Sequence, residues 1–148
     1  MKKVLWSVVL MFAAVSMWAH CQIPCGIYND DLRFELMEED INTVQKSTDM
    51  ILKLQQESPV NYNQLVRWIE NKDKHAENIQ QLAWYYFLAQ RVAPPEEDKA
   101  ASEKYLKKIE LLHKLIFYAM KAKQNVDAKY AKLLHENLDA FKKIYREK

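Results

Sequence analysis

The residues of this chain best suited to chemistry stand together near its amino-terminal end. Its only two cysteines, Cys21 and Cys25, follow closely after His20. In a chain that begins at His20, the α-amine, the Cys21 amide nitrogen and the Cys21 thiolate can chelate one metal ion, and Cys25 can add a second sulfur. A planar set of two nitrogens and two sulfurs selects Ni(II) or Cu(II), whereas zinc prefers a tetrahedral cage. Residues 20–28 are called the hook below.

A disulfide between Cys21 and Cys25 is the simpler interpretation of the same pair. Two cysteines in an exported protein commonly form one. Such a short loop, however, constrains little of the unfolded chain and contributes little stability, and it gives His20 no role. The residues alone leave the disulfide and the metal site open as alternatives.

The residues before the hook have the pattern of a secretory signal peptide. Two lysines follow the first methionine, and the apolar run over residues 4–15 is too short for a comfortable membrane span. We expect residues 1–19 to be removed by cleavage after Ala19, which exposes the His20 amine; cleavage after Ser16 is the alternative. The protein is then exported to the periplasm or the extracellular space, and it meets the membrane only transiently.

The motif HCxxPCGxY, which runs from His20 to Tyr28, resembles the nickel hook of the nickel superoxide dismutases. Residues 63–79 and 85–92 are similar to the second helix of that family. The resemblance implies an enzyme that converts superoxide into oxygen and hydrogen peroxide, with one nickel ion per chain that cycles between Ni(II) and Ni(III). It also implies a four-helix bundle and a homohexamer. The competing hypothesis is a non-enzymatic exported helical bundle whose hook holds the disulfide or a copper or nickel carrier site.

The resemblance also implies a set of metal ligands. The His20 amine, the Cys21 amide and the thiolates of Cys21 and Cys25 would bind nickel, with the His20 imidazole axial in the oxidised state. Thiolates and a deprotonated amide are strong electron donors, so they lower the potential at which nickel is oxidised. Sulfur ligation is therefore a requirement of the chemistry.

Further site residues are carried over from the same resemblance. Tyr28 would stand beside the open face of the metal, and Tyr86 would be a second gate tyrosine from the second helix. Glu35 matches the acidic residue that orients the axial histidine. Arg67 or Lys72, on the second helix, would complete that contact. The simpler role of tyrosines at such a junction is that of core residues with a polar tip.

The elements that position these groups are expected to be helices. The chain contains only one glycine in 148 residues. Glycine supplies the tight turns of all-β folds, so its scarcity argues against them. We expect residues 29–148 to form an all-α, up-down four-helix bundle, behind the signal peptide and the metal-binding hook. The first segment begins near Asn29 to Asp31 and ends before Ser58-Pro59, and the second begins near Asn61 or Asn63 and ends before Pro94-Pro95. The third runs from near Glu97 to near Lys123, and the fourth from after Asp127 to near Tyr145.

Apolar residues at helical spacing predict the inner face of each segment. They are Leu36 or Met37, Ile41, Val44, Ile51 and Leu54 in the first; Leu65, Ile69, Ala76, Ile79, Ala83 and Tyr86 in the second; Leu106, Ile109, Leu112, Ile116 and Met120 in the third; and Tyr130, Leu134, Leu138, Phe141 and Tyr145 in the fourth. We expect these four stripes to meet in one core.

Charge and the other histidines argue against further functions. Loss of the two leader lysines leaves 22 − 2 = 20 basic against 20 acidic residues, so the mature chain is formally neutral. Nothing indicates a nucleic-acid surface, and any attraction of an anion must be local. Di-iron bundles use Glu-x-x-His in pairs. The chain has one copy, Glu110 to His113, since lysines stand three residues before His75 and His135, so we expect these histidines at the surface or in helix interfaces.

Overall fold

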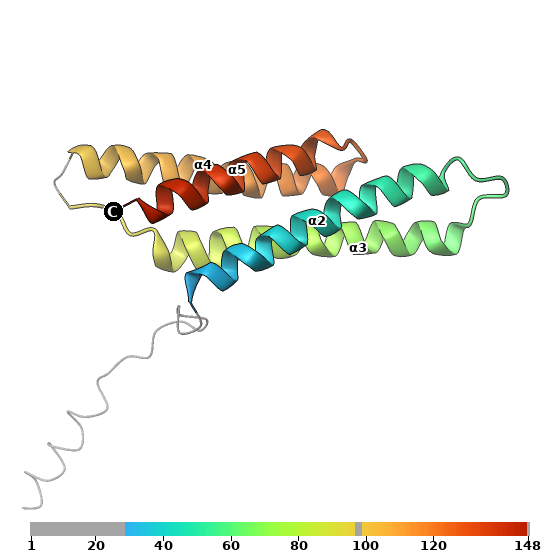
Figure 1. Cartoon of the computed structure of the whole chain (residues 1–148), viewed down its shortest axis with the longest axis horizontal. Helices are drawn as coiled ribbons and strands as arrows, with labels where there is room; N and C mark the ends of the chain where they lie inside the picture. Colours follow the sequence, from blue (N-terminus) through green and yellow to red (C-terminus); the bar gives the residue numbers. More distant parts are fainter. Residues whose placement is uncertain (1–28, 97–98, 148) are drawn as a thin grey trace, which may run out of the picture.

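The computed structural model describes residues 29–96 and 99–147, which form four helical rods. Helix α2 spans Asp30–Leu54; α3 spans Tyr62–Gln81 and continues into the π-helix η1, Leu82–Arg91; α4 spans Lys99–Gln124; and α5 spans Lys129–Arg146. The rods run up and down in turn, which confirms the predicted all-α four-helix bundle (Figure 1). The hook and the leader lie outside the described residues. Among the helices described, none has the length and apolar character of a membrane span.

Helices α2 and α3 begin at asparagine caps. The side chain of Asn29 accepts the N–H of Asp31 at 3.0 Å, and that of Asn61 accepts the N–H of Gln64 at 3.2 Å. These bonds satisfy N–H groups that have no partner within the helix. Asp30 and Asp31 add negative charge at the first turn of α2, where the helix dipole favours it. The start of α2, next to the hook, is therefore fixed by local interactions.

The core contains an aromatic cluster at the end of the bundle where the hook joins. Its members are Phe34 of α2, Phe87 of η1, and Phe141 and Tyr145 of α5, with ring centroids 4.8 to 5.7 Å apart. The three phenylalanines are at most 1% exposed. Aromatic contacts of this kind stabilise a core beyond the area they bury. The cluster therefore joins three elements directly beneath the start of α2.

The two hairpins are displaced along the bundle axis, so the turn between α2 and α3 extends beyond the turn between α4 and α5 (Figure 1). This displacement corrects part of the inner face predicted for the second segment. Ile69 is 38% exposed and Leu65 is half-buried, because at this overhanging end α3 packs on α2 without α4. The later positions of the stripe, from Ala76 to Tyr86, are buried as predicted.

The inner face predicted for the third segment is partly wrong. Leu106 is 63% exposed and Met120 is only half-buried, whereas Leu112 is buried as predicted and Ile109 and Ile116 pack, partly buried, against the core. The buried positions of α4 are Leu111, Leu112, Leu115, Ala119 and Ala122. Residues 109–120 carry apolar side chains on several sides of the helix, so periodicity does not select one face. The first and fourth stripes are confirmed, with Met37 rather than Leu36 fully buried.

Lys72 is an unpredicted member of the core, with 2% of its surface exposed. Its Nζ donates to the carbonyl oxygens of Ala122 and Lys123, the latter at 3.0 Å, and pairs with Asp73 at 3.0 Å. The last carbonyls of a helix lack partners within it and carry the negative end of its dipole. Lys72 therefore closes the carboxyl end of α4.

The sequence pattern does not predict the π-helix η1. In a π-helix the hydrogen bonds join residues five apart, as in the bond from the Val92 N–H to the Phe87 carbonyl at 2.9 Å. Residues five apart then lie on one side, whereas an α-helix would separate them by about 140° around the axis. Tyr86 and Arg91 are related in this way, and both contact α2.

Candidate functional site at the amino-terminal end of α2

The predicted nickel ligands His20, Cys21 and Cys25, and the predicted gate residue Tyr28, lie outside the described residues. Within the described ranges, no group of three or more His, Cys, Asp or Glu side chains could hold a metal ion. The chain has no cysteine besides Cys21 and Cys25. Two thiolates with nitrogen donors fit nickel, and in this chain thiolates can come only from the hook.

Asn29 links Tyr28 to the bundle and is the first described residue. Its φ of 75° and ψ of 139° place it in the positive-φ region, which asparagine tolerates better than most residues. The same residue caps α2 through its side chain. Asn29 therefore combines a positive φ with the cap of α2.

Asp30, the first residue of α2, is the centre of a hydrogen-bonded cluster. Its carboxylate accepts bonds from Tyr86 Oη at 2.5 Å, Tyr145 Oη at 2.6 Å and Arg91 Nη2 at 2.6 Å. The donors come from η1 and α5, so one carboxylate joins three elements. Asp30, Tyr86, Arg91 and Tyr145 are called the anchor cluster below.

The anchor cluster has well-defined protonation states near neutral pH. Burial acts to raise the pKa of Asp30, but the hydrogen bonds from Arg91, Tyr145 and Tyr86 together hold that pKa below its usual value. Burial and the bond to Asp30 raise the pKa of Tyr145 to about 12 and also raise the pKa of Tyr86. Asp30 is therefore an ionised acceptor, and both tyrosines are donors.

Tyr86, the predicted second gate residue, lies at the end of the bundle where α2 begins and is only 1% exposed. Its hydroxyl donates to Asp30, and its ring makes an edge contact with Phe87. The guanidinium carbon of Arg33 lies 5.1 Å from the centre of the Tyr86 ring. Tyr86 is thus held from three sides.

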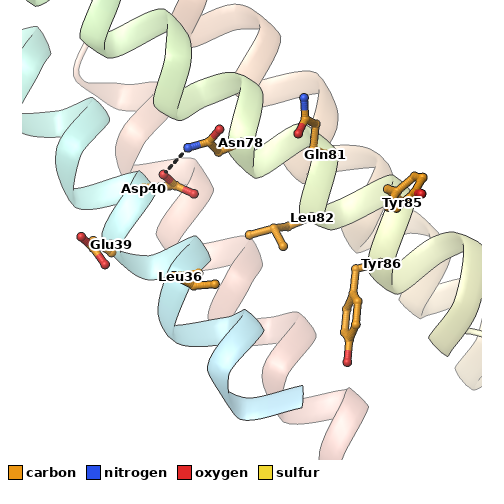
Figure 2. A pocket seen from close by; sticks show the side chains of 8 residues that line it. All are labelled: Leu36, Glu39, Asp40, Asn78, Gln81, Leu82, Tyr85 and Tyr86. Atoms are coloured by element: carbon orange, nitrogen blue, oxygen red, sulfur yellow. Dashed lines mark hydrogen bonds between the residues drawn. The ribbon is translucent and has the colours of Figure 1, made fainter. Parts of the chain in front are cut away.

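A cavity of about 460 Å³ lies beside Tyr86, between α2 and the rod formed by α3 and η1 (Figure 2). It is lined by Leu36, Glu39, Asp40, Asn78, Gln81, Leu82, Tyr85 and Tyr86. Asp40 Oδ1 accepts the Asn78 side-chain N–H at 3.0 Å and lies 2.6 Å from His75 Nδ1. His75 therefore has a partner at the interface of α2 and α3, as predicted. The cavity wall carries polar side chains from α3 and aromatic side chains from η1.

Glu35 and the two basic residues proposed beside it do not meet in the described structure. Glu35 lies on the exposed side of α2 and makes no hydrogen bond or ion pair with another described residue. Arg67 is exposed on the first half of α3, and Lys72 is engaged with the end of α4. At 1.5 Å per residue, Lys72 is roughly 20 Å from Tyr86 along the rod, and Arg67 is farther still.

Three members of the anchor cluster were not predicted as site residues. Asp30 looks like a helix-capping acid, because the same residue type serves both purposes. Tyr145 looks like the end of a core stripe, and Arg91 like a solvated charge before the Pro94-Pro95 break. No signal in the sequence indicates that these three side chains meet, since Tyr145 is 115 positions from Asp30.

The lone Glu-x-x-His belongs to no group of potential metal ligands among the described residues. Glu110 instead pairs with Lys107 at 2.8 Å and Lys114 at 2.5 Å on the surface of α4. The hydrogen bonds from these two lysines lower the pKa of Glu110 to about 2, and the bond from Lys107 has the larger effect. His113 is exposed and stacks on Phe117.

The chain matches the family model Sod_Ni, described as nickel-containing superoxide dismutase, over residues 15–148. No curated protein and no solved structure matches it. The matched region includes the hook and all four rods of the bundle.

Proposed function

Because the chain belongs to the family of nickel-containing superoxide dismutases, we propose that its hook holds the nickel and that the anchor cluster supports the hook. The activity follows from the family: the protein is a nickel-dependent oxidoreductase with superoxide as its substrate. One observation carries the proposal for the hook. The match spans residues 15–148, and the only cysteines of the whole chain are Cys21 and Cys25.

We assign the nickel ligands to the His20 amine and imidazole, the Cys21 amide and thiolate, and the Cys25 thiolate, with one ion per chain. When bound, nickel supplies the alternating one-electron oxidation and reduction that dismutation needs. The hook contributes strong donors for this purpose, since thiolates favour a higher oxidation state. The three protein residues that provide them lie within one short stretch, so the site needs a support that fixes its orientation.

Three further residues support this chemistry in different ways. Two superoxide ions and two protons give one oxygen and one hydrogen peroxide, so a proton donor must stand nearby. We assign that position to the Tyr28 hydroxyl. The Tyr86 hydroxyl already donates to Asp30, so Tyr86 acts as a wall and as a support for Asp30. The Glu35 carboxylate has no partner among the described residues, and we assign it the role of accepting the His20 imidazole N–H.

We further propose that residues 1–19 are a signal peptide, that the mature chain consists of the hook and the bundle of residues 29–148, and that it acts in the periplasm or outside the cell. Mass spectrometry of the exported protein tests this proposal. A mature terminus at His20 is expected, whereas a terminus at Met17 would contradict a free His20 amine.

The homohexamer is likewise a proposal. Large apolar side chains are exposed on the described surface, among them Tyr62 at 70%, Leu106 at 63% and Val66 at 52%. Exposed apolar groups of this size often lie in protein contacts. Sedimentation velocity of the mature protein tests the assembly, with a hexamer expected and a monomer as the contradicting result.

Superoxide decay after pulse radiolysis tests the nickel site. Two nickel-loaded chains are compared, one that begins at His20 and one that begins at Met17. We expect fast, nickel-dependent decay from the first chain only, because the second lacks the His20 amine as a ligand. A Cys25→Ser variant of the first chain should keep its helical circular dichroism and lose the fast decay. Equal decay from both chains, or fast decay from the variant, would contradict the assignment.

A further inference from the structure

Arg33 lies near the start of α2, and its guanidinium group is held over an aromatic ring. The guanidinium carbon lies 5.1 Å from the centre of the Tyr86 ring. At about 6 Å or less, a ring face attracts a cation and restrains it. Tyr86 is itself fixed, because its hydroxyl donates to Asp30 at 2.5 Å and its ring makes an edge contact with Phe87. The bundle therefore sets the position of the Arg33 guanidinium group.

One donor of this group, the Arg33 Nε–H, is buried without an acceptor among the described residues. No other buried side-chain nitrogen or oxygen in those residues lacks a hydrogen-bond partner. The two acids of the first turn of α2 serve other donors, since Asp30 belongs to the anchor cluster and Asp31 pairs with Arg146. Buried N–H groups nearly always have a partner, and one without a partner destabilises the fold. An acceptor for Arg33 is therefore expected outside the described ranges.

The hook is the segment outside those ranges that joins the chain next to Arg33. It ends at Tyr28, and Asn29, which follows, lies about one helical turn before Arg33. Residues 97–98 lead into α4, whereas the helices packed most closely on α2 are α3 and α5. Glu147, the residue before 148, lines a groove with η1 and α4. The hook is therefore the segment best placed to supply the acceptor.

The hook offers main-chain carbonyls as acceptors, and it contains no Asp or Glu. We propose that the Arg33 Nε–H donates to a main-chain carbonyl oxygen of the hook, which makes Arg33 a positioning residue for the nickel site. The inference rests on the proposed function. A guanidinium group holds its donors in a fixed plane, so this bond sets the orientation of the hook relative to Tyr86. The role depends on the direction of the N–H and not on the charge, because lysine carries the same charge without this donor.

Nuclear magnetic resonance tests the bond in the unaltered chain that begins at His20, isotope-labelled and loaded with Ni(II). We expect a scalar coupling across the hydrogen bond between Arg33 Nε and a main-chain carbonyl carbon of residues 20–28. The Arg33 Nε–H should also exchange with solvent at least about tenfold more slowly than the Nε–H of Arg146, whose side chain is 54% exposed. Neither measurement depends on activity.

Arg33→Lys tests the effect on the hook, with Arg146→Lys as the matched control at the same end of the bundle. Both changes keep the positive charge. In Arg33→Lys we expect amide hydrogen exchange of residues 20–28 to become roughly fivefold faster while exchange in α3 stays unchanged. The electron paramagnetic resonance signal of the oxidised nickel should broaden. At high ionic strength, where charges are screened, the second-order rate constant for superoxide should fall about threefold. The control should leave these measurements unchanged.

The outcomes separate this inference from the proposed function. Absence of a coupling to residues 20–28, or a coupling to a carboxyl carbon of Glu97, Asp98 or residue 148, would overturn the inference. Exchange of the Arg33 Nε–H as fast as that of Arg146 would also overturn it, since water would then be the partner, as would unchanged hook exchange in Arg33→Lys. Absence of nickel-dependent decay in the unaltered chain would instead contradict the proposed function. The coupling measured without nickel would then still decide whether Arg33 binds residues 20–28.

Discussion

Asp30 performs two tasks with one carboxylate. It places negative charge at the first turn of α2, and it accepts hydrogen bonds from Tyr86, Tyr145 and Arg91. A charged acceptor strengthens such bonds, and a buried donor left without its acceptor destabilises the fold. The anchor cluster therefore depends on the ionised form of Asp30 and on the protonated form of Tyr145.

This dependence predicts a pH profile for Asp30→Asn. The folded-state pKa of Asp30 is lowered, so its contribution to stability is present above about pH 4 and is lost as the pH falls through the folded pKa. The pKa of Tyr145 is raised from 10.0 to about 12, so its contribution is present below pH 10 and is lost as the pH rises through 12. At pH 7 we expect the variant to lose roughly 1–3 kcal/mol of unfolding free energy.

Urea unfolding followed by circular dichroism measures this profile. The difference between the wild type and Asp30→Asn should be largest near pH 7 and should shrink toward pH 3 and toward pH 12. Asp139→Asn, a change at an exposed acid of α5, is the matched control and should show little difference at any pH. A difference for Asp30→Asn that does not vary with pH would contradict the assigned protonation states.

At the scale of the elements, η1 determines which side chains reach α2. Tyr86 and Arg91 are five residues apart, and both contact the Asp30 carboxylate. The π-helical bonding brings them to one side of the rod. The anchor cluster is therefore a consequence of this local departure from α-helical geometry.

Insertion of one alanine after Leu88, which is 37% exposed, tests the five-residue spacing that η1 provides. The insertion places Arg91 six positions after Tyr86, so the two side chains lie about 120° apart around the axis if the segment becomes α-helical. In a double-mutant cycle, we expect the coupling between Asp30 and Arg91 to fall from about 1 kcal/mol to near zero. The coupling between Asp30 and Tyr86 is the internal control, because Tyr86 precedes the insertion. An unchanged coupling to Arg91 would show that the spacing provided by η1 is not needed for the contact.

Local signals predict the rods of the bundle well. Asn29 and Asn61 cap their helices, and Pro94-Pro95 follows the end of η1, so the limits of these elements were readable from the sequence. The π-helix was not, because residues 82–91 are rich in apolar and aromatic side chains that fit either kind of helix. The exposure of Leu106 was not predicted for a similar reason, because α4 carries apolar side chains on several of its sides.

The candidate site was predictable only in part. The hook motif is contiguous, and its donors can be read directly from the chain. The anchor cluster is assembled from α2, η1 and α5, and its side chains are of types that caps, cores and surfaces also use. Lys72 illustrates the same limit, because nothing in its neighbourhood in the sequence indicates that it closes the end of α4.

At the scale of the whole molecule, the metal site and the fold are built from different parts of the chain. The proposed ligands lie between His20 and Cys25, whereas the core is formed by residues from Phe34 to Phe141. An unfolded chain would keep the same contiguous ligands. Nickel can therefore bind both states, and a ligand that does so stabilises the folded state only by the difference in affinity.

This separation predicts a small effect of nickel on thermal stability. The melting temperature of the chain that begins at His20 should rise by less than about 3 °C when nickel is added. Differential scanning calorimetry measures the change, and Cys25→Ser, which lacks a proposed ligand, should show none. A rise of about 10 °C or more would indicate that a bundle residue such as Glu35 completes the coordination in the folded state.

The long sequence separation within the anchor cluster has a consequence for the order of folding. The bond between Asp30 and Tyr145 spans 115 positions, as does the pair formed by Asp31 and Arg146. Helices form from local contacts in about a microsecond, but closing so large a loop requires the rods to dock first. The anchor cluster is therefore among the last parts of the molecule to form. If that cluster supports the hook as proposed, a refolding chain regains its helices before it regains the capacity for catalysis, and it loses that capacity first when α5 detaches.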